Sequence, residues 1–234
     1  MSKKLYVFGC SYTENFITND IDNYTKYRLW RGGNFPLTWS EIIAKELDYE
    51  LINYGKGGIG NESIFKIFCN YSHEIKKGDM VIIQWTYVHR FDWFDIENDV
   101  IVNLGAGGKC NVSSITQSTY DEILINRTSK YYYDNVYTYM NLINSFSESL
   151  GFDLYFWSAG FNLIYGIESL LNKYKSKILM GETVKYDETT FHKVFENGGL
   201  TIDKETVGLI NDLHLGESGH RVLSELFLKE IKNK

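Results

Sequence analysis

The strongest constraint on this chain is a series of short apolar runs separated by stretches with helical periodicity. The run at 80–85, Met-Val-Ile-Ile-Gln-Trp, is almost wholly apolar. Such a run is typical of a strand in a parallel sheet that is covered on both faces. Similar runs predict further strands at 5–8, 50–54, 153–157 and 177–180.

Apolar residues at helical spacing fill the intervals between these runs. Trp39, Ile43 and Leu47 predict a helix over 39–47 with Thr38 as its N-cap. Further helices are expected around 64–68 and at 130–149, 162–174 and 217–232.

Strands that alternate with helices predict an α/β fold: a single-domain, doubly wound parallel sheet of the flavodoxin-like kind, with three α/β/α layers. We expect this domain to span residues 1–234, with an insertion or lid at about 92–128.

Composition and charge narrow the function classes. The 234 residues suffice for one sizeable core, and the net charge of -6 without a basic run argues against nucleic acid as a partner. No apolar stretch resembles a signal sequence or a membrane span, so we expect a cytoplasmic protein with no membrane partner, a phage or virion origin staying open. The three cysteines and five histidines lack metal-site spacing. No metal and no cofactor are expected.

Chemically active side chains gather where strands end. Ser11 follows the first strand, a cluster of glycines at 55–60 follows the second, and Gln84-Trp85-Thr86 closes the third. Ligands of doubly wound sheets bind beyond these carboxyl ends. Near the other end of the chain, Asp212-Leu213-His214 supplies a carboxylate and an imidazole. A hydroxyl, a base and a carboxylate are the minimum set for acyl transfer through serine.

Three motifs carry a resemblance to a known family. Gly9-Cys10-Ser11-Tyr12-Thr13 resembles block one of the SGNH hydrolases, also called GDSL-type esterases, where Gly-Asp-Ser-Leu holds the nucleophile. Asn53, followed five residues later by Gly58, resembles block two and its oxyanion-hole glycine. His214, with Gly219-His220 behind it, resembles block five.

The resemblance implies a serine esterase that acts on small acyl esters, by analogy O-acetyl groups on a carbohydrate, through a covalent acyl-enzyme. Ser11 is then the nucleophile and His214 the base. The family's usual Asp position holds Asn211, so we choose Asp212 as the orienting carboxylate, because a carboxylate suits an imidazolium better than an amide does. His220 is expected to pack or to cap a helix.

Block three, Gly-x-Asn-Asp, is absent, and with it the family's third oxyanion donor. The backbone N–H groups of Ser11 and Gly58 supply two donors. Asn61, Thr86 and Gln84 are candidates for the third, and Asn61 is favoured because it follows the glycine turn.

Residues just beyond the third strand are expected to line the substrate cleft. These are Gln84, His89 and Arg90. Arg90 can bind a carboxylate or a sugar hydroxyl, or it can pair with Asp92.

Two other function classes compete with this interpretation. Gly55-x-Gly57-x-x-Gly60 matches the dinucleotide fingerprint of an oxidoreductase, but the next strand ends in Gln84-Trp85-Thr86 instead of an acid. A catalytically silent SGNH-like binding or structural module, for instance a phage component, is supported by the missing block-three Asn. The retained Ser11, Asp212 and His214 oppose it.

Overall fold

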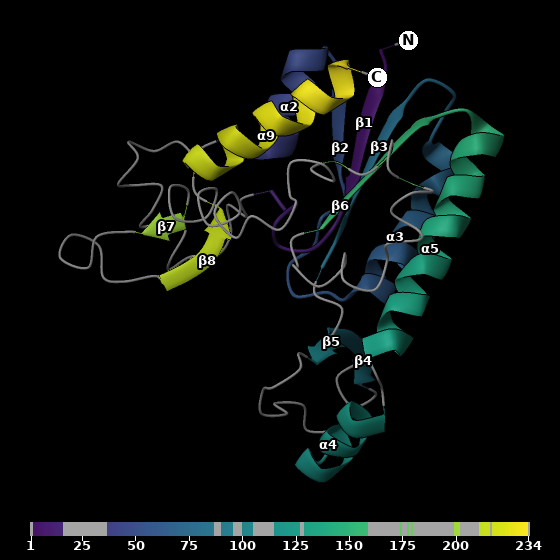
Figure 1. Cartoon of the computed structure of the whole chain (residues 1–234), viewed down its shortest axis with the longest axis vertical. Helices are drawn as coiled ribbons and strands as arrows, with labels where there is room; N and C mark the ends of the chain where they lie inside the picture. The colour runs from purple at the N-terminus through teal and green to yellow at the C-terminus, as the bar shows by residue number, and fades with distance from the viewer. Residues whose placement is uncertain are drawn as a thin grey trace.

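The computed structural model describes residues 2–15, 37–86, 90–95, 100–104, 115–126, 129–158, 174, 177, 179, 199–201, 211–215 and 217–233. At its centre lies a four-stranded sheet in the order β2-β1-β3-β6, with every neighbouring pair parallel (Figure 1). The strands are β1 (Lys4–Phe8), β2 (Glu50–Asn53), β3 (Met80–Trp85) and β6 (Asp153–Ser158).

Helices cover both faces of this sheet (Figure 1). Helices α2 (Trp39–Leu47) and α9 (Glu217–Lys232) lie on one face, and α3 (Asn61–Tyr71) and α5 (Ser129–Leu150) lie on the other. The predicted doubly wound, three-layer α/β/α fold is therefore confirmed.

Aromatic side chains join the layers. The Trp39 ring of α2 packs edge-on against Trp157 of β6 and Phe227 of α9, with centroid distances of 5.6 and 5.5 Å. On the other face, Phe8 of β1 packs edge-on against Phe68 of α3 at 5.5 Å. Every residue of β3 is buried, which agrees with its unbroken apolar run.

Most predicted elements have the expected bounds. Thr38 forms a capping box with Glu41 at the start of α2, where the Thr38 N–H donates to the Glu41 carboxylate at 2.7 Å. Helix α3 begins at Asn61, one turn before its first predicted apolar position. The predicted helix at 162–174 lies outside the described residues except for Tyr174.

The predicted strand at 177–180 is not found among the described residues. Lys177 lies in a 3-10 helical conformation and Leu179 in a turn, and residues 178 and 180 fall outside the described part. The Leu179 N–H still donates to the carbonyl of Phe156 in β6 at 2.8 Å. Leu179 is buried, so its apolar character reflects packing against the edge of the sheet.

The segment expected as an insertion contains structure of its own. Strands β4 (Phe91–Asp95) and β5 (Val100–Leu104) form an antiparallel pair, and α4 (Gln117–Asn126) follows. Figure 1 shows these elements beyond the carboxyl ends of the sheet strands. This is the edge where a ligand is expected.

A second small antiparallel pair precedes the last helix. It consists of β7 (Gly199–Thr201) and β8 (Asn211–Leu215), beside the start of α9 (Figure 1). The sequence does not predict β8, because its five residues mix polar and apolar types too evenly to indicate a strand. None of the helices in the described part of the chain is long and apolar enough to cross a membrane.

Alkaline pH should destabilise the fold. Burial raises the pKa of Tyr54, Tyr137 and Tyr139 to about 12, and the hydrogen bond to the Glu74 carboxylate adds to the shift of Tyr54. The unfolded chain ionises these tyrosines near pH 10, so between about pH 10 and 12 it binds fewer protons than the folded chain, and stability falls as pH rises.

The melting temperature at pH 8, 10 and 11 checks this expectation, with Tyr54→Phe as a control whose alkaline decline should be shallower. A melting temperature that stays constant to pH 11 would contradict it.

Candidate active site at the carboxyl edge of the sheet

Ser11 lies in a tight turn directly after β1. The backbone N–H groups of Thr13 and Glu14 both donate to the carbonyl of Cys10, at 2.8 and 3.1 Å. Among residues 10–13, only Ser11 is partly exposed. The turn therefore offers the Ser11 hydroxyl at the carboxyl edge of the sheet while its neighbours are packed inside.

The Gln84 side chain binds this turn from the neighbouring strand. Its Oε1 accepts from the Cys10 N–H at 2.8 Å and from the Thr13 hydroxyl at 3.1 Å. Its Nε2 donates to the carbonyl of Trp85 at 2.7 Å. The sequence predicts a substrate or oxyanion contact for Gln84. The structure instead buries this side chain completely and engages both of its amide groups within the protein.

Asn53 binds the same turn from the other neighbouring strand. Its Nδ2 donates to the Thr13 carbonyl at 2.7 Å, and its Oδ1 accepts from the Gly55 N–H at 2.7 Å. The Lys56 N–H also donates to the Gly9 carbonyl at 3.0 Å. These bonds fix residues 55–60, the glycine loop, against the Ser11 turn.

The glycine loop lies directly beside Ser11. A Cβ added at Gly57 would stand 3.8 Å from the Ser11 Cβ and 2.6 Å from a carboxylate oxygen of Glu14. Gly58 has a φ of +73°, so its glycine is required by the backbone conformation, and no atom of the described residues lies within 4 Å of an added Cβ.

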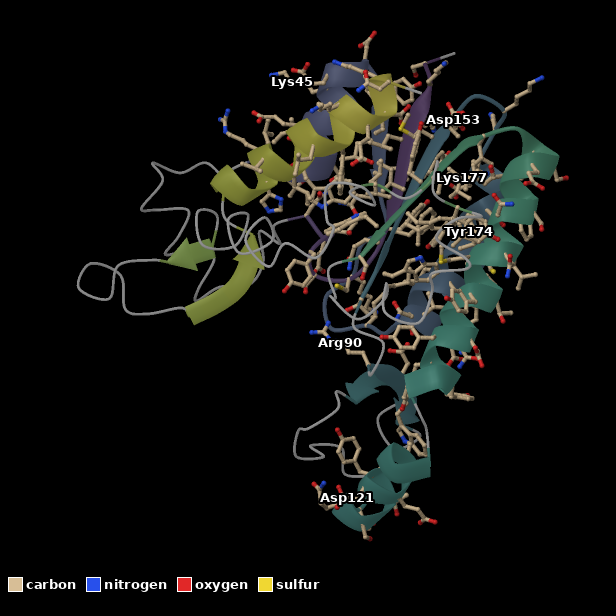
Figure 2. All side chains as sticks on the ribbon, in the orientation of Figure 1. Lys45, Arg90, Asp121, Asp153, Tyr174 and Lys177 are labelled. Carbon is tan, nitrogen blue, oxygen red and sulfur yellow. The ribbon has the colours of Figure 1, made fainter. Side chains whose placement is uncertain are left out.

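Two hydrogen bonds join the Asn61 side chain to the Thr86 backbone at the carboxyl edge of the sheet. The Asn61 Oδ1 accepts from the Thr86 N–H at 2.8 Å, and its Nδ2 donates to the Thr86 carbonyl at 3.2 Å. Both side chains are buried. The Arg90 guanidinium donates to the Thr86 hydroxyl at 3.3 Å. Figure 2 shows Arg90 between the carboxyl end of the sheet and the β4–β5 pair. Predicted oxyanion and substrate residues thus meet at one edge.

Asp92 has a role that the sequence does not reveal. Its two carboxylate oxygens accept from the Gly60 and Ser63 N–H groups, at 2.7 and 3.0 Å. The N-cap of α3, Gly60, has no side chain to cap the helix. Asp92 therefore supplies the cap and the negative charge that a helix N-terminus favours. No local sequence signal identifies a cap from a residue so distant in the chain.

His220 caps a helix, as expected from the sequence. Its Nδ1 accepts from the Trp39 N–H at the start of α2, at 3.1 Å, and its side chain is buried. An accepting Nδ1 requires the neutral ring with its proton on Nε2. The Trp39 indole in turn donates to the Tyr12 carbonyl at 2.8 Å. Through Trp39, the last helix is tied to the Ser11 turn.

Asp212 and His214 lie on β8, just before α9. Their side chains fall outside the described part of the structure, as does His89 altogether. The roles of these three residues therefore stay predictions. Within the described residues, no three His, Cys, Asp or Glu side chains form a group that could hold a metal ion.

No protein-family model matches this chain, and no curated protein matches it by sequence. The solved structures that are similar to this chain include the following two. YXIM_BACsu from Bacillus subtilis has a TM-score of 0.50 at 14% identity, covering 100% of this chain and 57% of that protein. A member of the lipolytic protein G-D-S-L family from Veillonella parvula has a TM-score of 0.48 at 13% identity, covering 100% of both chains. The likeness to the Bacillus structure, at this identity, concerns the fold alone.

Replacing His220 should cost stability more than activity. His220→Ala leaves the buried Trp39 N–H without an acceptor, which costs about 1–3 kcal/mol of unfolding free energy. His220→Asn retains an acceptor near the position of Nδ1 and should lose less. Urea unfolding measures both variants. If His220→Ala unfolds like the wild type but abolishes ester hydrolysis, His220 is the base and the assignment of His214 is wrong.

Proposed function

We propose that the protein is a serine esterase of the SGNH kind that hydrolyses small acyl esters. The observation that carries the proposal is the placement of Ser11. It is the partly exposed residue of a turn held between two neighbouring strands, and the glycine loop lies beside it, where a Cβ added at Gly57 would stand 3.8 Å from the Ser11 Cβ. This arrangement joins the block-one and block-two motifs, which lie more than forty residues apart in the sequence.

The proposed reaction proceeds through an acyl-enzyme. His214, oriented by Asp212, takes the proton of the Ser11 hydroxyl as its oxygen attacks the ester carbonyl. His214 then returns that proton to the departing alcohol, and water releases the acyl group by the same steps in reverse order. Imidazole suits both transfers because its ordinary pKa lies near neutrality.

The tetrahedral intermediate needs donors for its oxyanion. We assign two of them to the backbone N–H groups of Ser11 and Gly58. Asn61 supplies the third in this proposal: its Nδ2 carries two hydrogens, and the bond to the Thr86 carbonyl uses one of them. The reciprocal bonds to Thr86 hold the amide plane still, as a preorganised donor requires.

Arg90 and His89 are proposed to contact the substrate. The position of Arg90 at the carboxyl edge supports this assignment (Figure 2). A guanidinium there can bind a carboxylate or a sugar hydroxyl of the alcohol part. Esters of acetate on a carbohydrate are the substrate class that the family resemblance favours.

Loss of the nucleophile or the base should abolish hydrolysis. Ser11→Ala removes the attacking oxygen, and His214→Ala should lower kcat by several orders of magnitude. Initial rates on p-nitrophenyl acetate measure both, and circular dichroism confirms that the variants are folded. Undiminished hydrolysis by Ser11→Ala would refute the proposal.

The third oxyanion donor is tested by two variants assayed side by side. Asn61→Ala should lower kcat by about 10²–10³ with little change in KM, as the loss of one donor typically does. Thr86→Val, which removes a hydroxyl but keeps the shape, should lose less than about tenfold, and Thr86→Ser serves as its control. If both variants lose less than about tenfold, the site works with two donors.

A silent binding or structural module is the second candidate. The observation that favours it is the absence of the block-three Asn from the loop after β3. A wild-type protein that neither hydrolyses activated esters nor reacts with a serine-directed probe would support this alternative.

A further inference from the structure

We propose that Gln84 is a positioning residue for the nucleophile: its side-chain oxygen holds the Ser11 turn in the reactive conformation. This inference rests on the proposed function. Gln84, a core residue of β3, then influences catalysis indirectly, through the position of Ser11.

The strand register explains how Gln84 reaches the turn. Phe8, the last residue of β1, pairs with Ile83 of β3, and Gln84 is the next residue along. Beyond Phe8 the chain leaves the sheet, so the Cys10 N–H has no partner in a regular ladder. The Gln84 Oε1 supplies that partner at 2.8 Å. A side-chain oxygen thus continues the hydrogen bonding of the sheet into the turn.

A single atom fixes the turn on both sides of Ser11. The same Oε1 accepts from Cys10, which precedes Ser11, and from the Thr13 hydroxyl, two residues beyond it, at 3.1 Å. A carbonyl oxygen has two lone pairs, and both are used here. The bond from Nε2 to the Trp85 carbonyl, 2.7 Å long, fixes which end of the amide faces the turn.

Burial makes this contact effective. The Gln84 side chain is fully buried, so no water competes for these bonds. Breaking them leaves buried polar groups without hydrogen-bond partners. The glycine before the turn is part of the same arrangement. A Cβ at Gly9 would stand 2.5 Å from the Gln84 Oε1 and 2.3 Å from the Thr13 Oγ1. The backbone can approach the amide this closely only because residue 9 is glycine.

A shift of the Ser11 oxygen by a fraction of an ångström weakens its attack, because rate depends steeply on the alignment of the reacting atoms. Loss of the Gln84 oxygen should therefore reduce the reactivity of Ser11 by more than the lower folding stability of the variant protein accounts for. A merely structural residue would not show this excess.

The test measures how fast a fluorophosphonate probe labels Ser11 in three variants. Gln84→Met keeps the length of the side chain and removes all three hydrogen bonds. Asp79→Asn is the matched control: Asp79 is buried at the opposite end of β3, where its carboxylate accepts from the Lys4 and Lys76 N–H groups at 3.0 and 2.9 Å. It perturbs the same strand far from the Ser11 turn.

We expect Gln84→Met to label about tenfold to a hundredfold more slowly than the wild type. With p-nitrophenyl acetate, kcat should fall while KM stays close to the wild-type value. Asp79→Asn should label at the wild-type rate although it also lowers the melting temperature.

Gln84→Glu adds a pH signature. A neutral carboxylic acid still accepts from Cys10 and Thr13 and donates to the Trp85 carbonyl. The ionised form loses that donor and places a buried negative charge against the Ser11 turn. Burial raises the pKa of such a carboxyl towards neutrality. The labelling rate of Gln84→Glu relative to wild type should therefore fall as pH rises from about 5 to 9, whereas the ratio for Gln84→Met should stay flat.

Two results would overturn the inference while leaving the proposed function intact: a wild-type labelling rate in folded Gln84→Met, or an equal loss in Asp79→Asn at equal stability. If Gln84→Met does not fold, a pH-independent ratio for Gln84→Glu overturns it instead. A wild-type protein that the probe does not label at Ser11 would overturn the proposed function and this inference together.

Discussion

The site depends on one constraint: the turn after β1 cannot satisfy its own buried backbone groups. The Cys10 N–H and the Thr13 carbonyl both lie past the end of β1, outside its strand pairing. Gln84 binds the first and Asn53 the second. Because these partners come from β3 and β2, the strands on either side of β1, the turn exists in this form only when the sheet has assembled.

The same principle ties the end of the chain to its beginning. Trp39 donates through its indole to the Tyr12 carbonyl and through its backbone to His220 of the last helix. Its ring also packs against Phe227 of that helix. The position of α9 is thereby set relative to the Ser11 turn, and β8 directly precedes α9 in the chain. This linkage is a physical reason for the two ends of the sequence to contribute to one site.

Sequence patterns predict the parallel sheet because its strands are short, largely apolar runs. They also predict α2, whose cap and apolar spacing agree, and a packing or capping role for His220, which caps α2. They did not predict β8, whose residues mix polar and apolar types, nor the cap that Asp92 provides to α3. The cap depends on a residue about thirty positions further along the chain, which no local periodicity encodes.

The role of Gln84 could not be predicted from the sequence. A polar residue that ends a strand at the ligand-binding edge resembles a substrate contact. Whether such a residue faces the ligand or the core depends on the direction of its side chain. Here the side-chain oxygen of Gln84 accepts two hydrogen bonds from the turn after β1. Asn61 differs, because its amide joins the Thr86 backbone and still carries a further hydrogen.

The central claim is that Ser11 is a nucleophile activated by a base from the far end of the chain. It is tested most directly by treating the native protein with a fluorophosphonate and locating the adduct by peptide mass spectrometry. We expect one adduct per chain, on Ser11, that forms readily in the wild type and fails to form in His214→Ala. An adduct on another residue, or equal labelling of Ser11 in wild type and His214→Ala, would contradict it.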